Sequence, residues 1–382
     1  MHRAPRYAAP HFFNPAGSIE SLAAHGPENI VRSPGLVCSV HAPSGEGAGL
    51  KVLFVNEALV HELLAMDRCI DLVRAALVSF SRGDAVQPLR TILRLPDGAG
   101  ALGLMPAYLG DPKSFGLKVV SVMPGNSGTP YDSHQGVVML FGVMHGEPVA
   151  ILDATAITAL RTAAASAVAT DVLARQDAGD LALLGSGAQA QTHLAAMATV
   201  RRLRRIRIWS RTRANAERFS REQTAKVGIE IEVTAEPEDA VRNADIICTV
   251  TAAREPILRG AWLTPGAHVN AAGACFASHR ELDEEAVRRA RFFTDSRESC
   301  INESGDFLIA CLQGAIDEAH LLGEIGEVLL GRVPGRVSRD DITLYESLGI
   351  AVEDLVSAHA IYQQALATGA GVWLDWGRRS AE

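Results

Sequence analysis

The strongest indication of the fold is the stretch Asp180-Leu-Ala-Leu-Leu-Gly185-Ser-Gly187-Ala-Gln-Ala190. It begins with a short apolar run, and a helical pattern of small and apolar residues follows over residues 188–199. In such a GxGxxA turn the first glycine permits a tight turn, and the second lets backbone N–H groups approach a pyrophosphate at the helix N-terminus. The stretch therefore predicts a dinucleotide site at Gly185, Gly187, Ala188 and Gln189. The alternative is a plain glycine-rich turn between a strand and a helix.

Apolar runs alternate with helical patterns beyond this turn. Strands are predicted over residues 204–212, 229–233, 245–251, 267–273 and 291–295. Helices are predicted over residues 214–227 and 237–243. Alternation of strand and helix is typical of a parallel sheet with helices on both faces. The predicted fold class is therefore α/β, with a Rossmann-type doubly wound parallel sheet.

The end of the second strand distinguishes the two nicotinamide dinucleotides. NAD sites usually carry Asp or Glu there, which accepts hydrogen bonds from the ribose 2′-OH. Here the residues are Ser210, Arg211 and Thr212, with Arg213 beside them and no carboxylate. Because a guanidinium pairs with a phosphate through two hydrogen bonds, the pattern favours NADP(H), although it allows NAD(H). The alternative is that Arg211 and Arg213 only solvate a loop at a helix N-terminus.

Composition and charge bound the class of protein. The 382 residues carry 36 Lys+Arg against 44 Asp+Glu, and the formal net charge of -8 disfavours nucleic acid as a partner. The longest strongly apolar stretch identified in the sequence, residues 136–144, is about half as long as a membrane-spanning helix needs. With no secretory signal, we expect no membrane partner and a cytoplasmic location. Six cysteines without a CxxC pair predict no metal site.

The part of the chain before residue 153 is predicted to be α+β, without a phosphate-binding signature. This part and the alanine-rich helix after it contain three cations among apolar neighbours, Arg90, Lys118 and Arg161. Such a cation needs a partner, because an unpaired buried charge is costly. Three converging cations would form a pocket for a carboxylate. The alternative for each of them is a structural ion pair.

The chain resembles the ornithine cyclodeaminase/mu-crystallin family from about residue 51 to residue 366. Matching stretches in the first half are Leu104-Met-Pro-Ala, Gly116-Leu-Lys118, Ser133-His-Gln135 and Ile157-Thr-Ala-Leu-Arg-Thr-Ala-Ala164. Further stretches are Gly185-Ser-Gly-Ala-Gln189, Ile208-Trp-Ser-Arg-Thr-Arg, Thr249-Val-Thr, Glu255-Pro-Ile-Leu258 and Pro265-Gly-Ala-His-Val-Asn-Ala-Ala-Gly-Ala274. The last are Arg280-Glu-Leu-Asp, Asp295-Ser, Glu303-Ser-Gly-Asp306 and Ser347-Leu-Gly-Ile-Ala-Val-Glu-Asp354.

The resemblance implies a domain organisation and a homodimer. Residues 51–155 with 335–382 would form an α+β substrate-binding and dimerisation domain, and residues 156–334 an inserted NAD(P)-binding Rossmann domain. Residues 1–50, rich in proline, glycine and serine, are expected to be a loosely ordered extension.

The resemblance also implies roles for single residues. Arg90, Lys118 and Arg161 would bind the carboxylate of an amino or imino acid beside the nicotinamide. The cofactor site would include, besides the Gly185 loop and the residues after the second strand, Arg161, Thr162, Thr249, Val250, Thr251 and Asp295.

Two departures from the family pattern bear on the chemistry. Members that cyclise ornithine place an acid just before the stretch Leu104-Met-Pro106, and an Asp after Gly273. Here those positions are Gly103 and Ala274. A cyclodeaminase needs a carboxylate to hold and deprotonate the substrate amine, so this activity is the least favoured. The chain is more similar to the mu-crystallin branch, whose members reduce cyclic ketimines with NADPH.

The predicted function is NAD(P)H-dependent reduction of small cyclic 2-imino acids such as 1-pyrroline-2-carboxylate or 1-piperideine-2-carboxylate. Lys118 and His134 are the candidate proton donors. Asp306 is expected to orient the site or to cap the helix that begins near Phe307. The alternatives are an amino-acid dehydrogenase, an opine-type enzyme that couples an amine to a 2-keto acid, and an NADPH-dependent small-molecule binder.

Overall fold

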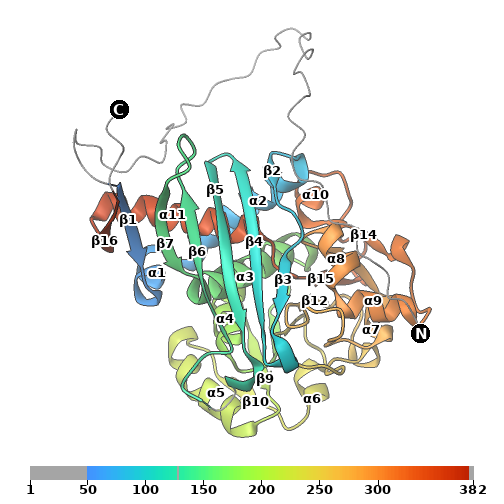
Figure 1. Cartoon of the computed structure of the whole chain (residues 1–382). Coiled ribbons are helices and arrows are strands. Elements are labelled where there is room, and N and C mark those ends of the chain that lie inside the picture. The colour runs from blue at the N-terminus through green and yellow to red at the C-terminus, as the bar shows by residue number, and fades with distance from the viewer. Residues whose placement is uncertain (1–49, 127–128, 378–382) are drawn as a thin grey trace, which may run out of the picture. The chain divides into compact units, whose positions relative to one another are not determined.

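The computed structural model describes residues 50–126 and 129–377, so the predicted N-terminal extension, apart from Leu50, lies outside the described residues. Two eight-stranded sheets organise the described part (Figure 1). The α-helices are α1 (Glu57–Leu63), α2 (Met66–Arg82), α3 (Ala154–Leu173), α4 (Ala188–Val200), α5 (Arg213–Val227), α6 (Pro237–Val241), α7 (Glu284–Arg289), α8 (Arg297–Glu303), α9 (Gly305–Leu312), α10 (Ile325–Leu329) and α11 (Ala351–Thr368). The 3-10 helices are η1 (Pro96–Gly98), η2 (Pro124–Asn126), η3 (Gly260–Trp262) and η4 (Glu318–His320).

The first sheet has the strand order β16-β1-β7-β6-β5-β4-β2, and β3 also pairs with β4. Its strands are β1 (Leu50–Val55), β2 (Ala85–Val86), β3 (Thr91–Arg94), β4 (Ala101–Gly110), β5 (Lys113–Val122), β6 (His134–Phe141), β7 (Pro148–Asp153) and β16 (Val372–Gly377). All neighbours are antiparallel except β1 and β7.

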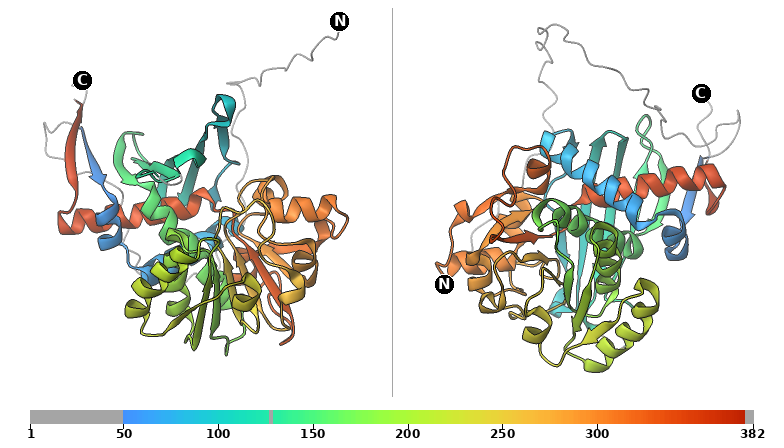
Figure 2. Two further views of the ribbon diagram at one scale, coloured as in Figure 1. Left: turned by 90° about the horizontal axis from the view of Figure 1, so that it is seen from below. Right: turned by 180° about the vertical axis from the view of Figure 1, so that it is seen from behind.

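Alternating burial gives the first sheet one inner face. Along β4, Met105, Ala107 and Leu109 are buried, whereas Tyr108 between them is exposed. Successive side chains of a strand point to opposite faces, so this pattern means that one face packs on the core. Helix α11 packs against β4, β5 and β6, and α2, α3 and α11 lie together behind the sheet (Figures 1 and 2). Lys118 of β5 is buried on this inner face.

The second sheet is parallel throughout, with the order β10-β9-β8-β11-β12-β15-β13-β14. Its strands are β8 (Asp180–Leu184), β9 (Arg205–Trp209), β10 (Ile231–Val233), β11 (Ile246–Thr249), β12 (His268–Ala271), β13 (Ala290–Thr294), β14 (Leu321–Glu324) and β15 (Ile342–Glu346). Its first five strands run 3-2-1-4-5 in chain order, which is the dinucleotide-binding order. The predicted Rossmann-type sheet is confirmed.

The second sheet continues past residue 334, where the predicted Rossmann segment ends. Strand β15 (Ile342–Glu346) lies between β12 and β13 and pairs with both. The strand is fully buried, so periodicity does not distinguish it from other apolar segments. The chain therefore leaves the second sheet only at residue 346, shortly before α11.

Helix α3 (Ala154–Leu173) is the longest helix in the described part of the chain. By length and hydropathy alone it could cross a membrane, which corrects the selection of residues 136–144 as the longest apolar stretch. In the structure 78% of its apolar window is buried, and it packs against α2, α4 and α11. A helix that is apolar all round is what the centre of a large core requires. Arg161, one of the three cations identified from the sequence, lies on this helix.

Candidate functional site

The turn between β8 and α4 has the conformation that its glycines predict. Gly185 has φ +124°, and a Cβ built there would lie 2.7 Å from the carbonyl oxygen of Val250. Gly187 is the N-cap of α4, where a Cβ would meet no atom within 4 Å. The first glycine is therefore required by backbone crowding, and the second leaves open space in front of the helix.

The N-terminus of α4 fits the pyrophosphate of a dinucleotide. No side chain caps the helix, and its first turn carries no acidic residue. Among the described residues, the buried Gln189 Oε1 and Thr249 Oγ1 have no hydrogen-bond partner. Free N–H groups at a helix N-terminus attract an anion, and unpartnered buried polar atoms nearby favour a polar ligand.

The residues predicted to bind a 2′-phosphate follow β9. Because β8 and β9 are parallel, these residues lie at the same edge of the sheet as the turn after β8. Ser186 Oγ donates a hydrogen bond to Ser210 Oγ at 2.9 Å, which joins the two loops. The exposed Arg213 pairs with Glu217 at 2.9 Å. Arg211 is exposed and makes no hydrogen bond or ion pair within residues 50–126 and 129–377. Of the two arginines, Arg211 is thus the one whose guanidinium is available.

Glu281 fixes the loops that follow β11 and β12. Its Oε1 accepts hydrogen bonds from the N–H and the hydroxyl of Thr251, both at 2.6 Å, and its Oε2 accepts from the Gly273 N–H at 2.9 Å. Asp306 Oδ1 in turn accepts from the N–H groups of Glu281 and Leu282. Burial raises the pKa of Glu281.

The expectation that Asp306 caps a helix near Phe307 is wrong. Ser304 is the N-cap of α9, and its hydroxyl accepts a hydrogen bond from the Phe307 N–H at 3.1 Å. Asp306 lies one residue inside the helix, so its carboxylate can turn away to the Glu281 segment. The alternative expectation, that it orients a neighbouring part of the molecule, agrees with these contacts.

Asp295 holds the linker between β15 and α11. It follows β13 directly, and its Oδ2 accepts hydrogen bonds from the N–H groups of Leu348 and Gly349 at 2.8 and 2.6 Å. Its Oδ1 accepts from the Ser296 N–H at 2.7 Å. Both oxygens thus bind backbone groups of the chain. Asp295 was expected in the cofactor site, and here its contacts position the linker that carries the carbonyl groups opposite Arg90.

Lys118 and Arg161 share one carboxylate oxygen. Asp354 Oδ1 lies 3.1 Å from Lys118 Nζ and 3.1 Å from Arg161 Nε. The neighbouring Glu353 receives Arg161 Nη1 at 2.9 Å. All four side chains are at most 5% exposed. Strand β5, helix α3 and the first turn of α11 therefore meet in a buried ion cluster.

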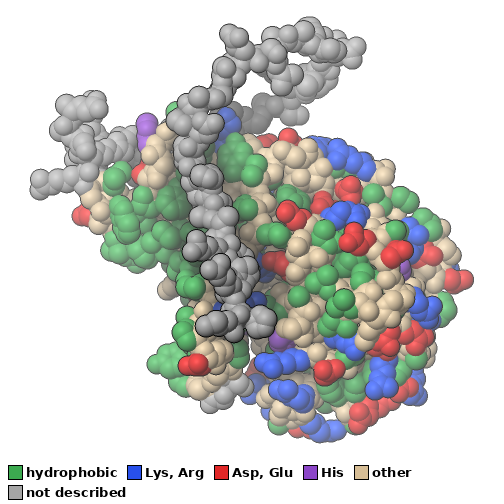
Figure 3. Space-filling model, turned by 45° about the vertical axis from the view of Figure 1, so that its right-hand side comes forward, with side chains coloured by type: hydrophobic (Ala, Val, Ile, Leu, Met, Phe, Trp, Pro, Cys, Tyr) green, Lys and Arg blue, Asp and Glu red, His purple; other side chains and the backbone are tan. Residues whose placement is uncertain are grey.

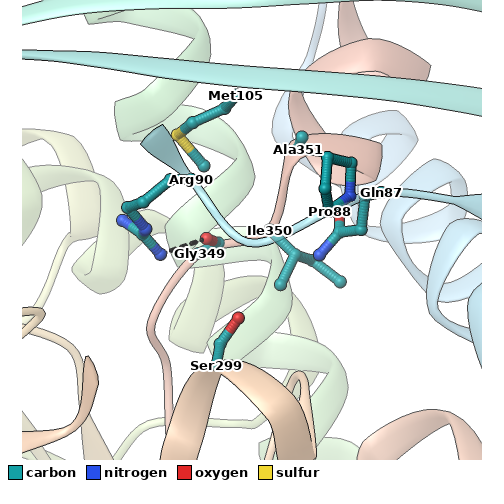
Figure 4. Close-up of a pocket in the computed structure, with 8 residues that line it drawn as sticks. All are labelled: Gln87, Pro88, Arg90, Met105, Ser299, Gly349, Ile350 and Ala351. Carbon is teal, nitrogen blue, oxygen red and sulfur yellow. Dashed lines mark hydrogen bonds between the residues drawn. The ribbon is translucent and has the colours of Figure 1, made fainter. Parts of the chain in front are cut away.

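Arg90 lies in the segment between β2 and β3, and its guanidinium contacts α8 and the linker between β15 and α11. Its Nε lies 3.0 Å from Glu303 Oε1, and its Nη2 donates to the carbonyl oxygens of Leu348 and Gly349. Figure 4 shows the contact with Gly349. A cavity of about 10 Å³ beside it is lined by Gln87, Pro88, Arg90, Met105, Ser299, Gly349, Ile350 and Ala351. This volume holds about one water molecule, so a ring-sized ligand requires these contacts to open.

The three predicted cations lie near one another, and each has the ion pair that the structural alternative predicted. They also keep donors: among the described residues, Arg161 Nη2 and Arg90 Nη1 make no hydrogen bond, and Lys118 Nζ makes one. An ammonium has three donors and a guanidinium five. The remaining donors can bind a carboxylate without breaking the Asp354 contacts.

Burial and charge shift the pKa values in this cluster. Burial lowers the pKa of Lys118 to about 8; the charge of Asp354 opposes the shift, and those of Arg161 and Arg90 increase it. Burial raises the pKa of Glu353 to about 8, and Arg161 opposes that shift. Arg161 stays charged, because the acidic pair on α11 outweighs its desolvation and raises its pKa. Lys118 and Glu353 can therefore both change protonation near neutral pH.

His134 begins β6 at the exposed end of the strand pair that contains Lys118. Its Nδ1 lies 3.0 Å from Ser133 Oγ, and the two residues are neighbours in sequence. Desolvation by neighbouring groups lowers its pKa, and the charge of Lys118 lowers it further. The structure therefore places His134 within electrostatic reach of Lys118 but at the surface, outside the buried ion cluster.

Four acidic residues of the site were not identified as such from the sequence: Glu281, Glu303, Glu353 and Asp354. All four lie in segments quoted for their resemblance, Arg280-Glu-Leu-Asp, Glu303-Ser-Gly-Asp306 and Ser347-Leu-Gly-Ile-Ala-Val-Glu-Asp354. For Glu353 and Asp354, the signal available in the sequence was their position in an apolar helix pattern, and the structure shows both of them fully buried. A charged residue is almost never fully buried unless it is paired.

Comparisons with known proteins agree with this geometry. The model of the ornithine cyclodeaminase/mu-crystallin family matches residues 51–369. The chain is 41% identical to mouse ketimine reductase mu-crystallin over 293 residues, which are 76% of this chain and 90% of the relative. Among solved structures, the Δ1-pyrroline-2-carboxylate reductase of Thermococcus litoralis with NADH and L-proline superposes with a TM-score of 0.82 at 37% identity, covering 84% of this chain and 99% of that one. An archaeal alanine dehydrogenase dimer with bound NAD gives 0.81 at 30% identity, covering 85% and 99%.

Proposed function

The chain belongs to the ornithine cyclodeaminase/mu-crystallin family, and we propose that it is an NAD(P)H-dependent reductase of small cyclic 2-imino acids. The reaction is the reduction of a C=N bond, as in 1-pyrroline-2-carboxylate to proline or 1-piperideine-2-carboxylate to pipecolate. The observation that carries the proposal is the group of three cations with unused donors, Arg90, Lys118 and Arg161, in a chain that also has a dinucleotide-type turn.

In this proposal the chain binds the substrate carboxylate through Arg161 Nη2, Arg90 and Lys118 Nζ. The bound dinucleotide supplies the hydride that C2 of the imine receives. The imine nitrogen must also gain a proton, and Lys118 is the buried donor. His134 is exposed, so its place in the proposal is at the entrance, where it can exchange protons with solvent.

A nicotinamide dinucleotide would be held by the Gly185 turn, with Gln189 and the segment Thr249, Val250 and Thr251 beside it. We further propose a preference for NADPH over NADH. Arg211 is unpaired in the described chain, and Ser210 and Thr212 offer hydroxyl groups next to it. A 2′-phosphate is a better partner for these groups than a ribose hydroxyl.

The two departures from ornithine-cyclising members are supported by the packing. The residue after Gly273 is Ala274, which is buried at 4% exposure and offers no carboxylate. At Gly103 a Cβ would come within 3.3 Å of Val120 Cγ1 and 3.5 Å of Ile92 Cδ1. A carboxylate side chain at position 103 would require these apolar neighbours to move. The proposal therefore excludes the release of ammonia from ornithine as the main reaction.

We also propose that two copies associate through the outer face of the first sheet. Within the described residues no helix of the chain covers this face, where Leu104, Leu117, Val119, Val137 and Met139 form adjacent, half-buried pairs. Figure 3 shows hydrophobic side chains gathered on this side of the molecule. Light scattering should give a dimer at micromolar concentration, and Leu117→Glu should give a monomer. A monomeric unmodified protein would contradict this part of the proposal.

The experiment that tests the function follows NADPH oxidation with 1-pyrroline-2-carboxylate, with 1-piperideine-2-carboxylate, and with pyruvate plus an amine, each repeated with NADH. We expect turnover of a cyclic imine, and a fall of kcat/KM by at least about tenfold in Arg90→Ala, since a hydrogen bond to a charged group contributes about 1.5–3 kcal/mol. If the protein binds NADPH and reduces none of the cyclic imines, the proposal is wrong and a coupling enzyme or a binder replaces it.

A further inference from the structure

Lysine is rare in this chain. The sequence contains four lysines, at positions 51, 113, 118 and 226, against 32 arginines. Lys51, Lys113 and Lys226 are exposed, whereas Lys118 is 4% exposed. Among ion pairs of the described residues, that of Lys118 is the one made by a lysine, and arginine makes the others.

The choice of lysine at position 118 has a chemical consequence. Arginine stays protonated in proteins, whereas the pKa of a lysine shifts readily when the side chain is buried. A lysine can therefore give up a proton at a place where an arginine could only hold a charge. Position 118 is inside the ion cluster, so its protonation depends on the groups packed around it.

Asp354 and Glu353 differ in what they contact, although they are neighbours on α11. Asp354 Oδ1 lies 3.1 Å from both Lys118 Nζ and Arg161 Nε. Glu353 contacts Arg161 alone, at 2.9 Å. Both acids are fully buried, so they provide a matched pair of carboxylates that differ in their contact with Lys118.

We propose that Asp354 is a positioning residue that keeps Lys118 protonated and aimed, so that Lys118 is the proton donor in imine reduction. This inference rests on the proposed function. In the step, C2 of the imine receives the hydride, the C=N π electrons become the nitrogen lone pair, and this pair takes a proton from Lys118 Nζ. The dinucleotide is oxidised and the imine is reduced to the amine. Lys118 is left neutral and regains its proton from solvent.

The groups that face Lys118 set the direction of the effect. Helix α11 contributes Asp354, α3 contributes Arg161, the segment before β3 contributes Arg90, and β6 contributes His134. Strand β4 places the uncharged Met105 opposite Lys118. With its nearest carboxylate removed, the ammonium keeps the charges of Arg161 and Arg90 beside it, so its pKa should fall below the value of about 8.

The test compares Asp354→Asn with Glu353→Gln in pH profiles of kcat/KM for 1-pyrroline-2-carboxylate with saturating NADPH. The basic limb of the unmodified protein should lie near pH 8, where Lys118 loses its proton. In Asp354→Asn it should move down by about one pH unit or more, since an opposite charge shifts a pKa by about 1–3. In Glu353→Gln it should move by less than half as much. The substrate's own titration is common to all variants.

A second readout measures Lys118 directly, by NMR of protein labelled with ¹³C at lysine Cε. Four signals are expected, and Lys118→Met identifies the one that belongs to Lys118. That signal should titrate at lower pH in Asp354→Asn than in Glu353→Gln. If Asp354→Asn does not fold, Asp354→Glu replaces it: the retained charge should keep the basic limb within about half a unit of its original place.

Two outcomes would overturn the inference: equal shifts in Asp354→Asn and Glu353→Gln, or a Lys118 signal that titrates unchanged in Asp354→Asn. Failure of the proposed function is a different result. In that case no cyclic imine is reduced by the unmodified protein, while the NMR titration still measures whether Asp354 controls Lys118.

Discussion

The two halves of the site differ in the kind of chemical group that they offer to a ligand, and we call them the backbone half and the side-chain half. At the edge of the second sheet, the groups available to a ligand belong mainly to the backbone, at the Gly185 turn and the start of α4. Beside the first sheet, they are side-chain cations, each held by a carboxylate. Backbone donors keep their charge state at every pH and depend on local conformation. The cations depend on partners far away in sequence, and Lys118 also on pH.

The largest effect is expected from a substitution that disrupts the ion pairs of the side-chain half. Arg161→Met leaves the buried Glu353 without its ion-pair partner and leaves Asp354 with Lys118 alone. Breaking a buried ion pair costs about 3–5 kcal/mol, so the free energy of unfolding should fall by about that amount. Urea unfolding followed by circular dichroism measures it.

The control for Arg161 is Arg213→Ala, which removes an exposed pair with Glu217. Exposed pairs contribute about 0–1 kcal/mol, so this variant should unfold close to the unmodified protein. Similar losses in both variants would mean that the buried cluster is no more important for stability than a surface pair.

The second largest effect is expected from a substitution that distorts the Gly185 turn in the backbone half. In Gly185→Ala the new Cβ would lie 2.7 Å from Val250 O, at a φ of +124°. Such strain costs about 1–3 kcal/mol, and relieving it displaces the turn, so the Kd for NADPH should rise by about tenfold or more. Titration of NADPH fluorescence measures the affinity. Gly187→Ala, where a Cβ has open space, is the control for the strain: its free energy of unfolding should fall much less than that of Gly185→Ala. Equal falls of unfolding free energy in the two variants would contradict this account.

A smaller effect is expected after β9, beside the backbone half, where it tests the preference for NADPH over NADH. Arg211→Ala removes the exposed guanidinium after β9. A hydrogen bond to a charged group contributes about 1.5–3 kcal/mol, so the Kd for NADPH should rise by about 10–100-fold. The Kd for NADH should change less than about twofold, because the lost group has no phosphate to bind there. Equal weakening of both cofactors would count against Arg211 as the phosphate ligand.

The smallest effect concerns the buried acids that hold the backbone half. Burial raises the pKa of Asp306, and the charge of Glu281 raises it further. A carboxyl whose pKa is higher in the folded state than in the unfolded state binds more protons when folded. Its contribution to stability is therefore largest below the unfolded pKa and is lost as pH rises toward the folded pKa. Asp306→Asn should therefore make the decline of unfolding free energy between pH 5 and pH 8 shallower, which urea unfolding at several pH values measures. An unchanged slope would show that Asp306 does not titrate in this range.

Sequence reasoning reached further in the backbone half than in the side-chain half. The Gly185 turn and the strands around it are local patterns, and the structure places the strands within a few residues of the expected ranges. The three cations were also identified, because each is conspicuous among apolar neighbours. Their partners were not, since Asp354 lies 236 residues from Lys118 and no local pattern joins them.

The boundary of the second sheet shows the same limit. Strand β15 consists of five buried residues, among them the polar Thr343 and Glu346, so it lacks the alternation of buried and exposed positions that marks many strands. Its place between β12 and β13 follows from packing with segments 70 and 50 residues away, roughly, which periodicity does not encode. Asp295 was visible as a candidate, but its contacts with the Leu348–Gly349 linker depend on where β15 ends.

The position of β15 has a consequence for biosynthesis. Because β15 joins β12 to β13, the β13–β14 pair has no place in the sheet until residues 342–346 have left the ribosome. Until then the nascent chain exposes the edges of β12 and β13, which are open to pairing with other chains. A protein shortened before residue 342 would keep these edges permanently, and we expect such a fragment to require a chaperone or to aggregate.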